Sequence, residues 1–191
     1  MKEIIYNRHN LEEKDITETV VRIKVLLING DNIILGNSDN IYQFPGGHLE
    51  EVESFDDCLK RELLEETGIE ISDDEIDKPI MKLTHMNKDW PDVGKNRKSE
   101  IYYYVVKTNK IPNLDKTNYT IEEKKGNFRL DLIPIDKVLD VINNNIPNNE
   151  KNKIIVEEMI QPINEYLSLN KKINKIKNTY CIFFKIGVFY C

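Results

Sequence analysis

One segment, Gly47 to Glu70, limits what this chain can fold into more than any other part of the sequence. Ser54 is a residue type favoured at a helix N-cap, and acidic residues follow it in the first turn, where the helix dipole favours them. Gly68 is a residue type that commonly ends helices. The segment therefore predicts a helix over residues 55–67, preceded by a loop that contains glycine.

The charge of this segment is local. Nine acidic residues stand against one lysine and one arginine between Gly47 and Glu70, which gives a net charge of −7, whereas the whole chain carries −6. The rest of the chain is therefore close to neutral. Acidity confined to one segment indicates a site, because a solubilising charge would be spread over the surface.

Three carboxylates gather on one face of the predicted helix. At about 100° per residue, Glu62, Glu65 and Glu66 fall within an arc of roughly 100°. Cys58 and Leu59 precede them on the same face and are expected to belong to the core. Each like-charged pair costs a few tenths of a kcal/mol, and a hard cation is the simplest compensation. An all-oxygen ligand set suits Mg²⁺ or Mn²⁺ better than Zn²⁺.

The spacing of this segment resembles the signature of the Nudix hydrolase family of MutT-like proteins. Its pattern is Gly, five residues, Glu, seven residues, Arg-Glu-aliphatic, one residue, Glu-Glu, one residue, Gly-aliphatic, met at every position from Gly47 to Ile69. Residues 43–47 also resemble the strand end and glycine loop of the family. A solvated Glu-rich face is the plainer explanation of an isolated cluster, but it does not account for seven fixed identities and two aliphatic positions. The resemblance implies an α/β fold, the Nudix-type α/β/α sandwich with a mixed sheet.

The resemblance also implies metal-dependent hydrolysis of a diphosphate linked to another group. The implied metal ligands, of which Glu66 is the strongest candidate, are Glu62, Glu65, Glu66, Glu53 and the carbonyl of Gly46. The implied catalytic residues are Glu53, Arg61, Glu65 and Glu123.

Arg61 resembles the arginine of the family that holds Glu53 or a neighbouring acid in place; the alternative is a surface ion pair worth under about 1 kcal/mol. Members of the family often add one more acid from outside the signature, and Glu123 or Glu122 is expected to supply it, with Glu100 as the alternative. All three are equally compatible with plain surface acids.

At 191 residues the chain is expected to form one domain. We assign residues 1–168 to the Nudix domain and residues 169–191 to a low-complexity tail that is loosely ordered or adds an edge strand. Predicted strands cover 17–29, 32–35, 41–44, 80–86, 99–107 and 128–133. Predicted helices cover 55–67, 135–142 and 151–169, the last bent or restarted at Pro162, with a linker at 143–147.

The remaining features concern compartment and partners. No signal peptide and no apolar run of 18 residues are recognisable, and the three cysteines (Cys58, Cys181 and Cys191) have no metal-ligand spacing and imply no disulfide framework. We therefore expect a cytoplasmic protein without membrane attachment. No basic stripe favours a nucleic acid polymer, so a small nucleotide-type substrate is expected, and a homodimer is compatible with the sequence.

Two other functions remain open at this point. One is a module that senses a nucleotide without cleaving it, and the other is hydrolysis of an RNA 5′ end. His48 and His85 have no partner recognisable from sequence and no place in the signature.

Overall fold

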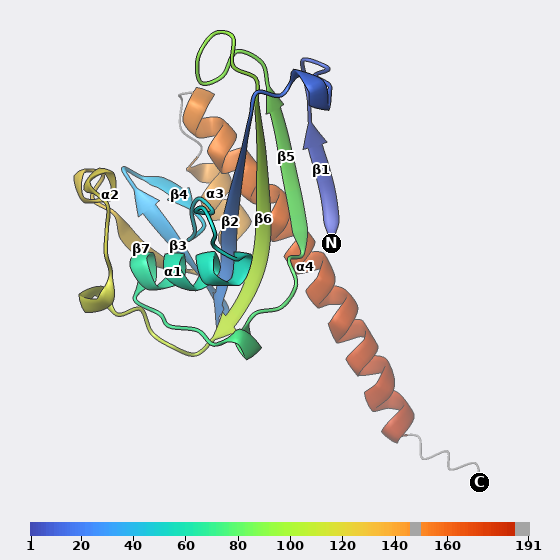
Figure 1. Ribbon diagram of the computed structural model, residues 1–191. Coiled ribbons are helices and arrows are strands. Elements are labelled where there is room, and N and C mark those ends of the chain that lie inside the picture. The colour runs from blue at the N-terminus through green and yellow to red at the C-terminus, as the bar shows by residue number, and fades with distance from the viewer. Residues whose placement is uncertain (146–149, 186–191) are drawn as a thin grey trace.

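A mixed sheet forms the centre of the protein (Figure 1). The computed structural model describes residues 1–145 and 150–185, and the side chains of these residues except 122–123, 150–152 and 174–185. In this part of the chain the sheet has seven strands in the order β1-β5-β6-β2-β3-β4, with β7 paired to β3. The strands are β1 (Lys2–Tyr6), β2 (Glu18–Asn29), β3 (Asn32–Ser38), β4 (Ile41–Gln43), β5 (Met81–Asn87), β6 (Arg97–Thr108) and β7 (Arg129–Pro134).

The strand pairings are of both kinds. β1 pairs with β5, and β2 with β6, in parallel, whereas the other neighbours are antiparallel. The β2–β6 pair is the longest, running from Glu18 opposite Arg97 to Asn29 opposite Thr108. The predicted mixed sheet is confirmed.

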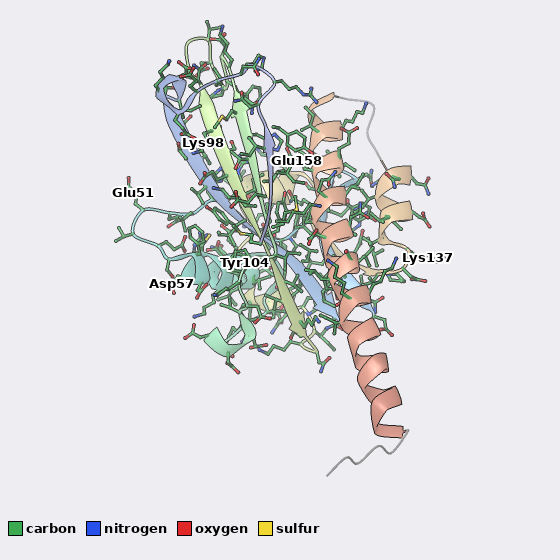
Figure 2. The ribbon with its side chains drawn as sticks, turned by 90° about the vertical axis from the view of Figure 1, so that its right-hand side faces the viewer. Glu51, Asp57, Lys98, Tyr104, Lys137 and Glu158 are labelled. Carbon is green, nitrogen blue, oxygen red and sulfur yellow. The ribbon has the colours of Figure 1, made fainter. Side chains whose placement is uncertain are left out.

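Helices cover both faces of this sheet (Figures 1 and 2). They are α1 (Phe55–Thr67), α2 (Ile121–Lys125), α3 (Val138–Asn144) and α4 (Glu150–Lys185), with short 3₁₀ turns η1 (Glu13–Asp15), η2 (Asp73–Glu75) and η3 (Leu114–Lys116). Successive side chains of a strand point to opposite faces, and β2 follows this rule. Ile23 and Val25 pack with α1, whereas Leu26 and Ile28 pack with α3 and α4. The predicted α/β/α layering is therefore confirmed.

The bounds of α1 are those predicted from the sequence, 55–67. Ser54 Oγ accepts a hydrogen bond from the Asp57 amide at 3.1 Å, which satisfies one of the free amides of the first turn. Gly68 ends the helix in the left-handed conformation, with φ of 68°.

Every strand predicted from the sequence is present, with ends that differ by a few residues. The prediction missed β1 and α2. β1 is five residues long and mostly exposed at the edge of the sheet, and only Ile4 packs against the core, so its sequence lacks the alternation of a half-buried strand. The five residues of α2 are too few for a helical period to be recognised.

The last helix differs from its prediction in length and continuity. α4 runs to Lys185, and Pro162 lies inside it, so of the two predicted alternatives, a bend or a restart at Pro162, the restart is wrong. Pro162 is buried with Ile163, and the packing of this turn on the sheet offsets the missing amide hydrogen bond. The loose order of 169–191 stays a prediction. Residues 146–149 and 186–191, which include Cys191 and part of the predicted linker, lie outside the described residues, as does the side chain of Cys181.

Cys58 is buried and its thiol is free. No helix in the described part of the chain combines the length and the apolar character that crossing a membrane requires.

Candidate active site

The glycine loop, which we define as residues 44–49, lies along the edge of β2. The Val25 amide donates to the Pro45 carbonyl at 2.9 Å, and the Ile23 amide donates to the Gly47 carbonyl at 3.0 Å. The loop therefore extends the sheet for a few residues before the chain enters α1. This pairing fixes the loop against a rigid strand, which is how a binding site is held in a set geometry.

Gly47 allows a close approach between the glycine loop and α1. A β-carbon at Gly47 would lie 2.3 Å from Glu62 Oε1, so any side chain here would displace that carboxylate. Glu66 Oε2 accepts a hydrogen bond from the Gly46 amide at 3.3 Å, and Glu66 is only 7% exposed. Glu62 and Glu66, two of the predicted metal ligands, therefore lie against the glycine loop, which contains the predicted carbonyl ligand of Gly46.

Arg61 lies among the other acids of the signature. Its guanidinium holds Glu53 through both oxygens, with Nε–Oε1 at 2.8 Å and Nη2–Oε2 at 2.9 Å. Its Nη1 donates to Glu62 at 2.7 Å and to Glu65 at 3.3 Å, and its Nη2 also donates to the His48 carbonyl at 3.1 Å. One cation thus connects three carboxylates with the glycine loop, and the expected contact between Arg61 and Glu53 is present.

Glu53 and Glu62 have pKa values shifted in opposite directions. The hydrogen bonds from Arg61 hold the pKa of Glu53 at about 2, so this carboxylate stays ionised at any working pH. Burial raises the pKa of Glu62, and this effect outweighs the hydrogen bond from Arg61. Both oxygens of Glu53 are engaged and the group is a weak base, so its contacts favour an anchoring role over proton abstraction.

The ligand chemistry fits a divalent cation. Among the described residues no three acidic, histidine or cysteine side chains converge on one metal-binding point. Arg61 stands between Glu53, Glu62 and Glu65 and is a single positive charge against three negative ones. Carboxylates together with the Gly46 carbonyl form the oxygen-only set that Mg²⁺ and Mn²⁺ prefer. The residues present therefore fit the implied metal in donor type and in uncompensated charge.

The position of Glu123 is known for its backbone only. It lies in α2, and its side chain is outside the described part of the chain. The segment before α2 is attached to the C-terminal part of α1, since the Asn118 amide donates to the Glu65 carbonyl at 2.8 Å. This attachment holds the segment that leads into α2 against the acidic end of α1 and is compatible with the predicted additional acid.

Glu100, the alternative additional acid, is engaged elsewhere. It forms ion pairs with Lys82 at 2.8 Å and with Lys98 at 3.3 Å. These two lysines already neutralise its charge, so Glu100 is the less suitable candidate for a base.

Two cations beside the glycine loop were missed by the sequence analysis. Lys24 Nζ donates to the carbonyls of Phe44, at 3.1 Å, and Gly46. Arg22 Nε donates to His48 Nε2 at 3.1 Å, which gives His48 the partner that the sequence did not reveal. Burial, and then the charge of Arg22, lower the pKa of His48. The sequence feature that could have identified these two cations is their spacing, two residues apart, inside a run of aliphatic residues predicted as a buried strand.

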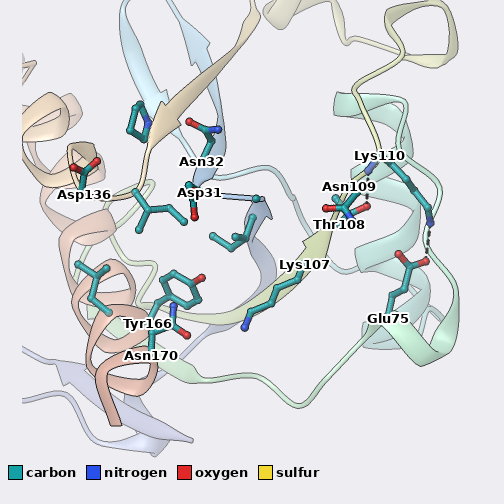
Figure 3. Close-up of a pocket in the computed structure, with 15 residues that line it drawn as sticks. Asp31, Asn32, Glu75, Lys107, Thr108, Asn109, Lys110, Asp136, Tyr166 and Asn170 are labelled. Carbon is teal, nitrogen blue, oxygen red and sulfur yellow. Dashed lines mark hydrogen bonds and ion pairs between the residues drawn. The ribbon is translucent and has the colours of Figure 1, made fainter. Parts of the chain in front are cut away.

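A large open groove in the described structure lies elsewhere (Figure 3). It has a volume of about 1370 Å³ and is open, lined by the β2–β3 turn, the C-terminal ends of β6 and β7, and α4. None of the predicted site residues lines it. Lys110, which protrudes beside it, is ion-paired with Glu75 at 2.7 Å. The acids of the signature gather at the glycine loop and α1 and not at this groove, so we place the candidate site there.

Residues 18–148 match the sequence model of the NUDIX domain, a span that includes the glycine loop, α1 and α2.

Solved structures with a similar arrangement include the ORF135 protein of Escherichia coli, with 16% identity, a TM-score of 0.49, and coverage of 79% of this chain and 94% of that one. A MutT protein from Bacillus halodurans has 19% identity, a TM-score of 0.49, and coverage of 72% and 80%. A MutT protein from Methanosarcina mazei Go1 has 15% identity, a TM-score of 0.45, and coverage of 64% and 82%.

Proposed function

The chain belongs to the NUDIX domain family, and from that premise we propose that it is a cytoplasmic hydrolase that needs Mg²⁺ or Mn²⁺ and cleaves the diphosphate linkage of a small nucleotide-type substrate. The proposed substrates are nucleoside triphosphates, ADP-ribose or nucleotide sugars. One observation carries the proposal: the acids of α1, Arg61 and the glycine loop meet in one place.

The roles rest on the contacts of the described side chains and, for Glu123, on the resemblance to the family. Glu62, Glu65, Glu66 and the Gly46 carbonyl would hold the metal ion. When bound, the metal supplies neutralisation of phosphate charge and a lowered pKa for a bound water. Arg61 positions Glu53 through a bidentate pair, and its single contacts to Glu62 and Glu65 can be exchanged without loss of that pair. Glu123 is proposed as the base that removes a proton from the attacking water.

The sensor alternative has less support. A protein that only binds a nucleotide does not need four carboxylates within reach of one arginine and one glycine loop, because their mutual repulsion costs stability. The retained acids favour catalysis.

The proposal is tested with the purified chain and a panel of nucleoside triphosphates, ADP-ribose, nucleotide sugars and 5′-triphosphorylated RNA. We expect phosphate, diphosphate or nucleotide products with Mg²⁺ or Mn²⁺, and none in excess EDTA, measured by product-resolved chromatography. Nucleotide binding without any product would establish the sensor instead. Undiminished turnover in EDTA would show that the acids do not bind a metal needed for hydrolysis. Cleavage of the RNA alone would change the assigned substrate class from small nucleotides to RNA 5′ ends.

Arg61→Lys is expected to lower kcat/KM by about 10-fold or more, because a lysine ammonium cannot hold both oxygens of Glu53 while also contacting Glu62. Steady-state kinetics with Mg²⁺ measures the effect. Lys60→Arg is the control, since Lys60 lies next to Arg61 in α1 but contacts Asp73. If Arg61→Lys stays within about twofold of the unaltered protein, Arg61 is a surface ion pair and not a positioning residue.

A further inference from the structure

Arg22 and Lys24 are two cations on β2 that form no ion pair with a described carboxylate, although Glu62 of α1 attracts Lys24 over a longer distance. They are two residues apart and therefore share a face of the sheet, the one covered by α4. Both are half-buried. Among the described side chains, no carboxylate oxygen lies within 4.0 Å of either cation. This pair is the counterpart of the acidic cluster on α1, with the opposite sign of charge.

Both cations donate to neutral atoms of the glycine loop. Lys24 Nζ contacts the Phe44 and Gly46 carbonyls, and Arg22 Nε contacts His48 Nε2. The loop therefore has Glu62 and Glu66 on one side and Arg22 and Lys24 on the other.

The neighbouring acids on this face form no ion pair with Arg22 or Lys24. Glu158 of α4 attracts Arg22 electrostatically, and its Oε1 lies 2.9 Å from His85 Nε2 without forming a hydrogen bond to it (Figure 2 labels Glu158 between the sheet and α4). Glu18 is paired with Arg97, a third cation of the same face, at 2.8 Å. Of the three cations, Arg22 and Lys24 are thus the two available to a ligand.

Half-buried cations with neutral partners are costly, and an anionic ligand relieves that cost. Burial is the main cause that lowers the pKa of Arg22, in agreement with a guanidinium withdrawn from water. Phosphate is the anion best matched to such a pair, because a guanidinium can bind two of its oxygens and an ammonium binds a third as a point charge.

We propose that Arg22 and Lys24 form a phosphate-binding subsite on the α4 side of the glycine loop, where they bind substrate phosphate oxygens that the metal held by α1 does not reach. This proposal rests on the proposed function. Lys24 contacts the same Gly46 carbonyl that is a proposed metal ligand, so Lys24 must leave this carbonyl when the metal binds. Its ammonium is then free for phosphate.

The test uses the whole chain and imidodiphosphate, a diphosphate that is not cleaved at an oxygen bridge, titrated calorimetrically in the presence of Mg²⁺. Arg22→Gln and Lys24→Met are each expected to weaken binding by about 10-fold or more, the scale of one hydrogen bond to a charged group. Arg129→Gln and Lys110→Met are the matched controls, because these cations already contact Asp131 and Glu75. The controls are expected to bind within about twofold of the unaltered protein.

A second measurement separates phosphate binding from loop structure. Mn²⁺ binding without any phosphate, followed by electron paramagnetic resonance, is expected to be unchanged or tighter in Lys24→Met, since a competing cation has been removed from the Gly46 carbonyl. A parallel loss of Mn²⁺ and imidodiphosphate binding would overturn the proposal, because Lys24 would then only support the loop. If Arg22→Gln does not fold, imidodiphosphate binding is measured in Lys24→Met and in Arg22→Lys, which retains the charge. These two variants then decide between a phosphate subsite and a role in supporting the loop.

These measurements distinguish a failure of the proposed function from a failure of the phosphate subsite. If the unaltered protein binds neither Mn²⁺ nor imidodiphosphate with Mg²⁺, the proposed function fails. If the unaltered protein binds both and Arg22→Gln and Lys24→Met bind imidodiphosphate equally well, only the phosphate subsite is wrong.

Discussion

Glu66→Gln is expected to slow hydrolysis at least about 10²-fold, the scale of losing one major electrostatic contributor to a transition state. Glutamine keeps the shape of the side chain and can still accept the hydrogen bond from the Gly46 amide, so the loop and α1 stay in contact. Only the negative charge is lost. The measurement is kcat with saturating Mg²⁺, together with the midpoint of thermal unfolding, which we expect to be close to that of the unaltered protein.

Glu51→Gln is the matched control for this change. Glu51 lies in the turn before α1, is exposed and projects away from the sheet (Figure 2). The Glu51→Gln change removes the same charge from the same acidic segment without altering a contact to the glycine loop. We expect kcat within about twofold of the unaltered protein. Full activity in Glu66→Gln would mean that α1 does not hold the metal. An equal loss in both variants would mean that the total charge of the segment matters and not the position of Glu66.

Local signals in the sequence were sufficient to predict α1 and its surroundings. Ser54 and Gly68 end the helix by hydrogen bonding and by backbone conformation, which depend on near neighbours in the chain. The alternation of β2 between its two core clusters follows from side-chain geometry alone. The mixed sheet and the α/β/α layers came from the resemblance and not from these local rules.

The contacts that were not predictable depend on long-range pairing. Arg22 meets His48, and Lys24 meets Gly46, because the glycine loop returns along β2 in a particular register. A shift of one residue in that register would place other residues of the loop beside the two cations. Sequence patterns predict that a strand exists, but they do not specify which loop lies beside it.

Charge complementarity connects the two halves of the candidate site. Arg61 neutralises part of the acidic face before a metal is present, and Lys24 occupies the Gly46 carbonyl. Both side chains reduce the repulsion or desolvation that an empty site would suffer. Binding of metal and phosphate together would replace these internal contacts by stronger ones, so we expect metal and phosphate to strengthen each other's binding.

Glu123→Gln is expected to lower kcat by about 10² to 10⁴-fold, the range for removal of a general base, with little change in KM. A base acts on the proton that is transferred in the transition state, so substrate binding in the ground state is not weakened. The segment before α2 is hydrogen-bonded to the Glu65 carbonyl of α1. The measurement is the pH dependence of kcat/KM, in which the acidic limb is expected to disappear with the carboxylate.

Glu122→Gln and Glu53→Gln are the informative comparisons. Glu122 is adjacent to Glu123 in α2 and is not the proposed base, so its loss is expected to leave kcat within about twofold. Glu53→Gln is expected to lower kcat without removing the acidic limb, because the pKa of Glu53 is held at about 2, below the range in which the limb falls. A silent Glu123→Gln with an inactive Glu122→Gln or Glu100→Gln would relocate the base and leave the hydrolase proposal standing. Loss of the limb in Glu53→Gln alone would make Glu53 the base, in spite of its pairing with Arg61.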